Sequence, residues 1–191
     1  MIPRVVVASK NADKLAEIEE VLGITGLVGE IVRGVDWEDV EETGVTLEEN
    51  ALLKARAAME ATGLPALADD TGLEVEALGG APGVLTARFA GDGARYEDNV
   101  AKMVSVMAVE TNRSARFRTV VALVFPDGSE IIADGAVEGV IADRPRGNRG
   151  FGYDPIFEVE GRTLAEMSAE EKNGLSHRAR ALRSLADAMG L

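Results

Sequence analysis

Several residue types are scarce or missing in this chain. Among its 191 residues there is no cysteine, one histidine and one tryptophan. Without cysteine there is no disulfide framework, no thiolate nucleophile and no cysteine-ligated zinc or iron–sulfur site. No apolar run approaches the roughly 18 residues of a membrane-spanning helix, and the opening sequence MIPRVVVASK becomes polar too early for a signal peptide. These absences predict a cytoplasmic protein with no membrane partner.

Positive charge is also scarce. The chain carries 20 lysine and arginine residues against 33 aspartate and glutamate residues, for a formal net charge of −13. A nucleic-acid-binding surface needs clustered lysine and arginine, so we expect no nucleic-acid partner. An anionic ligand must therefore be met by a local group of cations or by a metal ion.

The length and the hydrophobic content of 46% are those of a globular protein with a sizeable core. No internal repeat, low-complexity tract or linker interrupts the sequence. We therefore expect residues 1–191 to form one domain, with two lobes sharing a sheet as a form of it.

Hydrophobic spacing in the first part of the chain predicts strands that alternate with helices. A strand over residues 4–9 precedes a helix that starts near Asp13 and ends before Gly23. A second helix, with a capping box at its start, is expected from Thr46 until Gly63 ends it.

The rest of the chain continues this alternation. A short buried strand over residues 67–70 ends in carboxylates, and a helix with a methionine stripe, which is core packing by default, starts near Asp98. Strand-like runs over 117–125 and 129–141 flank a Pro-Asp-Gly turn and predict an antiparallel hairpin. The last helix follows Ser176 as a candidate N-cap. The fold class is therefore α/β with a mixed sheet.

The loop between the first strand and the first helix is a candidate anion site. Backbone N–H groups at a helix start favour an anion, and lysine adds point charge. An ordinary turn with solvated lysines is the alternative. The loop consists of Ser9, Lys10, Asn11, Ala12, Asp13 and Lys14.

Two groups of carboxylates are candidates for metal binding or acid–base chemistry. The run from Asp36 to Glu42 has five carboxylates in seven residues, and is either a solvated loop or a source of ligands for a hard divalent cation. Asp69 and Asp70 follow an apolar strand, where a buried carboxylate needs a cation nearby. Successive strand residues face opposite sides, so a regular strand would direct only one of the two into a given cleft. The alternative is a pair of strand-end acids that cap the next turn.

Three further segments carry polar chemistry. Lys54 lies among small apolar residues of the second helix, where it either extends to solvent or reaches a phosphate. The segment Phe151-Gly152-Tyr153-Asp154 offers aromatic rings and an acceptor to a heteroaromatic base, or is a turn with packed aromatics. The third segment is a local group of cations, which is a more specific sign of an anion-binding site because the chain as a whole is strongly acidic. It is formed around the start of the last helix by Lys172, Ser176, His177 and Arg178.

Taken together, these segments resemble the inosine triphosphate pyrophosphatase family. Five of the family's motifs occur in order from end to end: ASKNADKLAEI, EETGVTLEENALLKA, ADDTGLEVEALGGAPGVLTARFAG, GFGYDPIF and EKNGLSHRARAL. The resemblance implies an elongated two-lobed α/β fold with the active-site cleft between the lobes, and a homodimer. It also implies Mg²⁺-dependent cleavage of inosine, deoxyinosine and xanthosine triphosphates to the monophosphate and pyrophosphate, which clears these nucleotides from the pool.

The resemblance also implies roles for individual residues. Ser9 to Lys14 would hold the triphosphate, and Lys54 would touch its pyrophosphate end. Glu41 and Asp70 would bind the metal, with Asp70 as the general base and Asp69 beside it. Substrate contacts would come from Thr71, Phe151, Gly152, Tyr153, Asp154, Lys172, Ser176, His177 and Arg178, the residues from 151 onward surrounding the purine. The chain departs from many members at Thr71, where they have serine, and at Lys10, where they have glycine; neither departure removes a reacting group.

Base selection follows from the purine itself. Hypoxanthine and xanthine present a 6-oxo acceptor, whereas adenine presents a 6-amino donor. Donors such as His177 or Arg178 suit the oxo group, and rejection by unpaired buried donors reaches roughly 10⁴-fold.

Two other interpretations of the same residues stay open. One is a phosphohydrolase with an aspartyl nucleophile, although the string Asp69-Asp70-Thr71 lacks the expected D-x-D-x-[TV] pattern. The other is a regulatory module that binds nucleotide without hydrolysis. A module of that kind gains little from carboxylates that face phosphates unless a metal bridges them.

Overall fold

The computed structural model describes residues 1–38 and 40–190. The strands of this part of the chain are β1 (Ile2–Val7), β2 (Val28–Val32), β3 (Ala66–Val75), β4 (Pro82–Gly83), β5 (Ser114–Val124), β6 (Glu130–Ile141), β7 (Phe157–Val159) and β8 (Arg162–Thr163). The α-helices are α1 (Ala12–Thr25), α2 (Leu47–Thr62), α3 (Tyr96–Met107), α4 (Ala169–Leu175) and α5 (His177–Ala188). Short 3-10 helices are η1 (Glu76–Leu78), η2 (Thr86–Arg88) and η3 (Leu164–Glu166).

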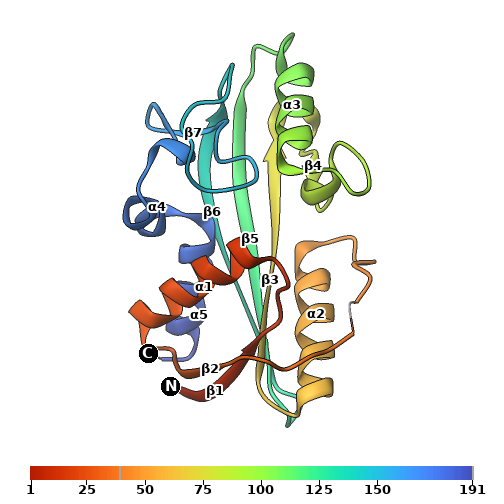
Figure 1. Ribbon diagram of the computed structural model, residues 1–191, viewed down its shortest axis with the longest axis vertical. Helices are drawn as coiled ribbons and strands as arrows, with labels where there is room; N and C mark the ends of the chain where they lie inside the picture. The colour runs from red at the N-terminus through yellow and green to blue at the C-terminus, as the bar shows by residue number, and fades with distance from the viewer. Residues whose placement is uncertain (39, 191) are drawn as a thin grey trace. The chain divides into compact units, whose positions relative to one another are not determined.

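The described strands form a mixed sheet (Figure 1). Their order is β2-β1-β3-β5-β6-β7-β8, and β4 pairs with β3. β1 is parallel to both β2 and β3, whereas β4 is antiparallel to β3 and β7 is antiparallel to β6 and β8. The predicted α/β class with a mixed sheet is therefore confirmed.

The chain divides into two compact units. Unit 1 comprises Met1–Asp70, Thr119–Gly135 and His177–Leu191, and unit 2 comprises Thr71–Arg118 and Ala136–Ser176. Strands β3, β5 and β6 contribute residues to both units.

The core of unit 1 lies between its strands and the helices α1 and α5, which pack together (Figure 1). The apolar residues of α1 that the spacing predicted, Ile18 and Leu22, are fully buried there, and Leu182 and Leu185 of α5 join them. At roughly 25 cal/mol per Å² of buried apolar surface, this packing is the main term that holds α1 and α5 to the sheet.

The core of unit 2 is built on α3. Met103 and Met107 are fully buried, so the methionine stripe is core packing as predicted. The same core holds Phe117 and Phe157, whose ring centroids lie 4.7 Å apart.

Helix α2 follows the predicted capping pattern with one difference. Thr46 is the N-cap, and its side chain accepts a hydrogen bond from Glu49 N at 3.2 Å. The Glu49 carboxylate returns to Val45 N at 2.7 Å, one residue before the N-cap. Gly63 ends the helix with a φ of 66°, a conformation that costs glycine less than other residues.

The predicted end of α1 was wrong by three residues. Gly23 lies inside the helix, and the C-cap is Gly26 with a φ of 64°. Both glycines were available as stop signals. Leu22 inside the helix and Leu27 after it are both buried, and α1 continues for three more residues between them before the chain enters β2.

Strand β3 is longer than the four residues predicted, so Asp69 and Asp70 lie in its interior and are not strand-end caps. The alternative of a turn directly after Asp70 is wrong, because Gly72 continues the strand beside β4. A Cβ at Gly72 would come within 3.1 Å of the Gly83 carbonyl oxygen. Glycine here permits close approach of two backbones, which is one of its known uses in strands.

The β5–β6 hairpin is confirmed, and its turn closes with a Phe125 N to Ser129 O bond of 2.9 Å. Several elements escaped prediction, among them β2, α4 and the short strands β7 and β8. In β2, Gly29 and Glu30 break the apolar alternation. The start of α4 does carry a capping-box signal, because Ser168 and Glu171 cap each other's backbone N–H groups.

Among the described residues, no helix combines the length and the apolar character needed to cross a membrane.

Candidate active site

Strand β3 directs its two neighbouring carboxylates to different sets of partners in unit 1. Asp69 contacts residues of α1 and α5, whereas Asp70 contacts residues of α2. The alternation of side chains along a regular strand produces this division. Both residues are buried, at 2% and 6% exposure, so each needs compensation for its lost hydration.

Asp69 is held by two cations. Its Oδ2 lies 3.3 Å from Lys14 Nζ and accepts hydrogen bonds from Nε and Nη2 of Arg178, both at 3.2 Å. The third nitrogen of that guanidinium, Nη1, donates to Glu17 of α1. Lys14 and Arg178, which are far apart in the sequence, therefore meet at one carboxylate.

The charges around Asp69 outweigh its burial. Burial alone would raise the pKa of Asp69, but Lys14, Arg178 and Lys54 hold it well below its usual range. Burial alone would lower the pKa of Arg178, and Asp69 and Glu17 raise it instead. Asp69 therefore stays ionised and serves as an anchor for two cations.

Asp70 has a weaker set of partners. Lys54 Nζ donates to its Oδ1 at 3.1 Å, and Asn50 Nδ2 donates to its Oδ2 at 3.4 Å. Asn50 and Lys54 are four residues apart on α2 and so share a face of the helix. Lys54 also donates to Glu42 at 2.8 Å, so two carboxylates share one ammonium group.

The pKa of Asp70 is raised, in contrast to that of Asp69. Burial is the largest cause, Lys54 and Lys14 offset it only in part, and Glu42 adds to it. Burial alone would lower the pKa of Lys54, but Asp70, Asp69 and Glu42 raise it. Of the two neighbouring carboxylates, Asp70 is thus the one whose negative charge is incompletely balanced.

The start of α1 is a structured turn that ends close to Asp69. The side chain of Asn11 is the N-cap and accepts from the backbone N–H groups of Asp13 at 3.0 Å and Lys14 at 3.1 Å. Asn11 N donates in turn to Ser9 Oγ at 3.3 Å. The amide oxygen of Asn11 is therefore occupied by capping the helix. Lys10 and Asp13 are exposed.

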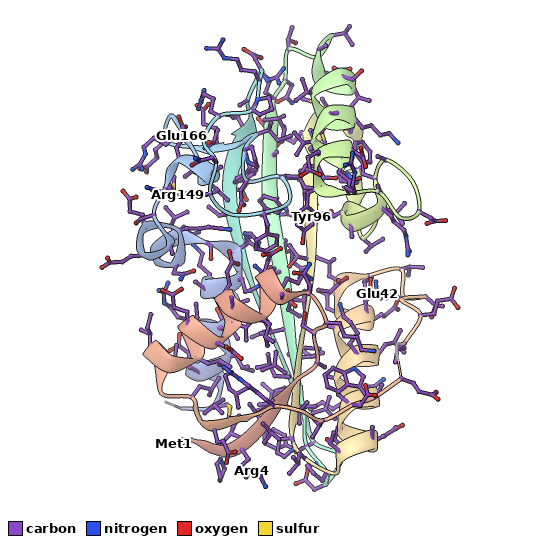
Figure 2. The ribbon with its side chains drawn as sticks, viewed as in Figure 1. Met1, Arg4, Glu42, Tyr96, Arg149 and Glu166 are labelled. Atoms are coloured by element: carbon purple, nitrogen blue, oxygen red, sulfur yellow. The ribbon has the colours of Figure 1, made fainter. Side chains whose placement is uncertain are left out.

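The acidic segment before α2 is linked to Asp70 through Glu42, which shares Lys54 with it. Glu41 is exposed, and Asp39 lies outside the described residues. Gly44 N donates to Asn50 Oδ1 at 2.8 Å, and a Cβ on Gly44 would come within 2.5 Å of that oxygen. Glycine is therefore required for the loop to approach α2 this closely. Figure 2 labels Glu42 beside the start of α2.

Unit 2 holds the predicted aromatic group. Phe151 N donates to Asp154 Oδ2 at 2.8 Å, and Lys172 Nζ donates to the same oxygen at 2.6 Å. Lys172 also lies 4.8 Å from the centroid of the Phe151 ring. A Cβ at Gly150 would come within 2.0 Å of Asp154 Oδ2, so this turn closes around the carboxylate.

The remaining aromatic residue of this segment is a buried support. The Tyr153 hydroxyl donates to the Thr86 carbonyl at 2.9 Å, and burial raises the pKa of Tyr153. Gly152, with a φ of 60°, permits the turn between Phe151 and Tyr153. Thr71 is half-buried on β3 in the same unit.

The predicted cationic group at the last helix is divided between the units. Lys172 and Ser176 belong to unit 2, whereas His177 and Arg178 open α5 in unit 1. All four are buried, and the two long cations are paired with carboxylates rather than solvated.

Three residues of the site were not singled out by the sequence interpretation, although one of them, Glu42, ends the acidic run that it named as a candidate. They are Glu17, Glu42 and Asn50, which contact Arg178, Lys54 and Asp70 respectively. Asn50 had a usable signal, since it is a polar residue at helical spacing from Lys54. Glu17 and Glu42 had none that separates them from the neighbouring acids.

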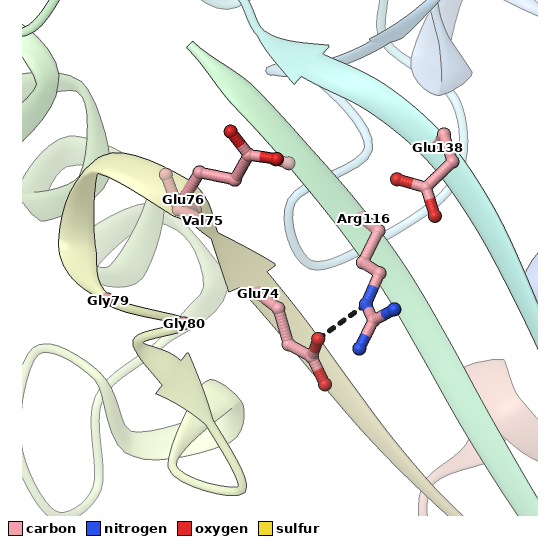
Figure 3. Close-up of a pocket in the computed structure, with 8 residues that line it drawn as sticks. Glu74, Val75, Glu76, Gly79, Gly80, Arg116 and Glu138 are labelled. Atoms are coloured by element: carbon pink, nitrogen blue, oxygen red, sulfur yellow. Dashed lines mark hydrogen bonds and ion pairs between the residues drawn. The ribbon is translucent and has the colours of Figure 1, made fainter. Parts of the chain in front are cut away.

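Among the described residues, each unit has a cavity of its own. In unit 1, a cavity of about 350 Å³ has Ser9 and Lys10 in its wall, together with apolar residues such as Leu15 and Trp37. In unit 2, a cavity of about 460 Å³ surrounds Arg116, which is paired with Glu74 at 2.5 Å (Figure 3). Glu74, Glu76 and Glu138 line this second cavity, so its charge does not suit a polyanion.

Fold and site together define a class: an α/β protein in which buried lysine and arginine side chains meet carboxylates at a charged site. The chain belongs to the Ham1 family, whose model matches residues 5–188, and the resemblance seen in the motifs is confirmed. It is 46% identical over 192 residues to a dITP/XTP pyrophosphatase of Streptomyces avermitilis, covering 95% of this chain and 94% of that one. It is 52% identical over 184 residues to a dITP/XTP pyrophosphatase of Symbiobacterium thermophilum, covering 94% and 91%.

Solved structures show the same fold. The Ham1 protein of Staphylococcus aureus matches with a TM-score of 0.86 and 38% identity over 98% of both chains. A HAM1 protein from Coxiella burnetii matches with a TM-score of 0.83 and 41% identity over 99% of both chains.

Proposed function

We propose that this protein is a nucleoside triphosphate pyrophosphatase that hydrolyses inosine, deoxyinosine and xanthosine triphosphates to the monophosphate and pyrophosphate. Its similarity to proteins named dITP/XTP pyrophosphatase supports this substrate class. The observation that carries the chemistry is the contrast between Asp69, balanced by two cations, and Asp70, which is buried with one shared lysine. Neighbouring carboxylates in contrasting environments are suited to separate roles.

Unit 1 would bind the phosphates. Lys14 and Lys54 supply positive charge, and the turn from Ser9 to Lys14 supplies backbone and side-chain donors at a helix start. Asp69 and Arg178 would act as positioning residues, because both are fully engaged with other charged groups. In this proposal Arg178 keeps Asp69 and Lys14 in place rather than contacting the purine.

The donor set of the Asp70 side fits Mg²⁺. Asp70 and the acidic segment before α2 offer carboxylate oxygens, which this hard cation prefers. Within the described residues no three such side chains converge on one point, and Mg²⁺ commonly uses one or two carboxylates with waters and substrate phosphates. Asp70 and the exposed Glu41 would be its ligands, while Glu42 holds Lys54. When bound, the ion supplies charge neutralisation and lowers the pKa of a coordinated water.

Asp70 would act as the general base. Water attacks the α-phosphorus, its proton passes to the Asp70 carboxylate, and the bond to the bridging oxygen of the β-phosphate breaks. The products are the monophosphate and pyrophosphate, with no covalent enzyme intermediate. The geometry supports this role, because the Asp70 carboxylate is buried and Lys54, its ion-pair partner, is shared with Glu42.

Unit 2 would bind the purine. Phe151 offers a ring for stacking, while Asp154 and Lys172 hold the segment and supply polar groups. Thr71, Gly152, Tyr153 and Ser176 would shape the surroundings of the base. His177, which opens α5 in unit 1, is proposed from the family resemblance as a donor to the 6-oxo group, and adenine would leave that donor unpaired.

A panel of purine and pyrimidine triphosphates with Mg²⁺ tests the proposal. We expect monophosphate and pyrophosphate from the inosine and xanthosine nucleotides and little turnover of ATP. In water enriched in ¹⁸O, the label should appear on the product with no phosphorylated protein. A phosphoenzyme would support the aspartyl-nucleophile alternative, and binding without pyrophosphate release would support the regulatory alternative.

We also propose a homodimer located in the cytoplasm, where the nucleotide pool supplies the substrate. The family resemblance supports the dimer. Sedimentation equilibrium gives the oligomeric state, and a mass of one chain at micromolar concentration would contradict it.

A further inference from the structure

A tyrosine outside the predicted site contacts the proposed base-stacking ring. Tyr96 is the first residue of α3, and Figure 2 labels it at that end of the helix. Its ring centroid lies 5.8 Å from that of Phe151, with an angle of 41° between the ring planes. This separation is within the range of favourable aromatic pairs.

The helix start that carries Tyr96 is held firmly in place, although the Tyr96 side chain is exposed. Val100 and Met103 anchor α3 in the core of unit 2. Asn99 ties the helix start to the preceding loop, accepting from Ala90 N at 2.7 Å and donating to the Ala87 carbonyl at 3.0 Å. Tyr96 nevertheless remains 37% exposed. It therefore presents a fixed aromatic ring to solvent next to Phe151.

The Phe151 ring is contacted by side chains from outside its own turn. Its backbone lies between Gly150 and Gly152, both with positive φ, and outside any helix or strand. The Asp154 carboxylate accepts a hydrogen bond from the Phe151 backbone N–H. The ring itself is contacted by the Lys172 ammonium and by Tyr96. A cation and a second aromatic ring thus hold Phe151 in one orientation.

We propose that Tyr96 is a positioning residue for the purine: its ring packs on Phe151 and holds that ring ready to stack with the base. This inference rests on the proposed function. The contact needs the aromatic ring of Tyr96 and not its hydroxyl group. Loss of the ring weakens binding of the base in the ground state and the transition state alike, and so raises KM while leaving kcat unchanged.

The test compares Tyr96→Ala and Tyr96→Phe with Val109→Ala as the control. Val109 is an exposed apolar residue of the same unit and has no place in the site. For Tyr96→Ala we expect KM for inosine triphosphate to rise about two- to tenfold, the range for loss of one aromatic pair, with kcat within twofold. Tyr96→Phe and Val109→Ala should match the unchanged protein.

Inhibition by inorganic tripolyphosphate measures binding of the phosphates alone, because this compound has no purine base. Its inhibition constant should be the same for Tyr96→Ala and the unchanged protein, and the melting temperature should stay within about 2 °C. An unchanged KM in Tyr96→Ala, an equal loss in Tyr96→Phe, or a parallel rise in the tripolyphosphate constant would overturn the inference. Absence of turnover by the unchanged protein would instead count against the proposed function.

Discussion

On one side of β3, Asp69 meets Lys14 and a fully buried Arg178; on the other, Asp70 meets Lys54, which it shares with Glu42. The two residues are neighbours in sequence and almost equally buried. Their pKa values nevertheless shift in opposite directions, because the first has more positive charge around it than burial requires and the second has less. Local charge balance, rather than residue type or burial, thus sets the direction in which the pKa of each buried carboxylate shifts.

The largest effect is expected from Asp70→Asn. An amide cannot accept the proton of the attacking water, so kcat should fall about 10²- to 10⁴-fold. Nucleotide binding and the folded structure should be retained, because the change removes an incompletely balanced buried charge. Steady-state kinetics and equilibrium binding measure the two effects. Asp187→Asn, an exposed position on α5, is the control. Near-normal turnover by Asp70→Asn would remove Asp70 from the mechanism.

Arg178→Met tests the other side of the comparison. The substitution leaves Glu17 without its arginine and Asp69 with fewer cations, and breaking a buried ion pair of this kind costs about 3–5 kcal/mol. Urea unfolding should show a loss of that size in the free energy of unfolding. Arg180→Met, at an exposed position two residues further along α5, should change it by about 0.5 kcal/mol or less. Equal stability of the two variants would mean that the ion pairs of Arg178 with Asp69 and Glu17 do not stabilise unit 1.

Glu41→Gln and Glu42→Gln test which of the two glutamates binds Mg²⁺ together with Asp70. The effect expected here is the smallest of the three. If Glu41 binds Mg²⁺, its substitution should raise the free Mg²⁺ concentration for half-maximal activity by about tenfold or more. Glu42→Gln should change that concentration much less, because Glu42 contacts Lys54. Activity measured across a Mg²⁺ titration gives both values. A larger shift for Glu42→Gln than for Glu41→Gln would mean that Glu42, and not Glu41, binds Mg²⁺.

Local sequence patterns predicted those helix ends and turns that are stabilised by a few adjacent residues. The N-cap at Thr46, the Gly63 stop and the β5–β6 turn are each determined by a few adjacent residues. Prediction failed at Gly23, which stays inside α1, and at Gly72, which continues β3. At both positions contacts with distant residues override the local preference for a turn.

The sequence by itself determined the α/β class, the family and most of the chemical groups of the site, because periodicity, capping residues and ordered motifs are local properties. Only the tertiary structure decided which charges meet. Arg178 and Asp69 are 109 positions apart, yet they form a buried pair. Glu42 rather than Glu41 contacts Lys54, and Tyr96 lies against Phe151. Partner choice depends on distances and burial that arise when remote segments pack together, and no local pattern records these quantities.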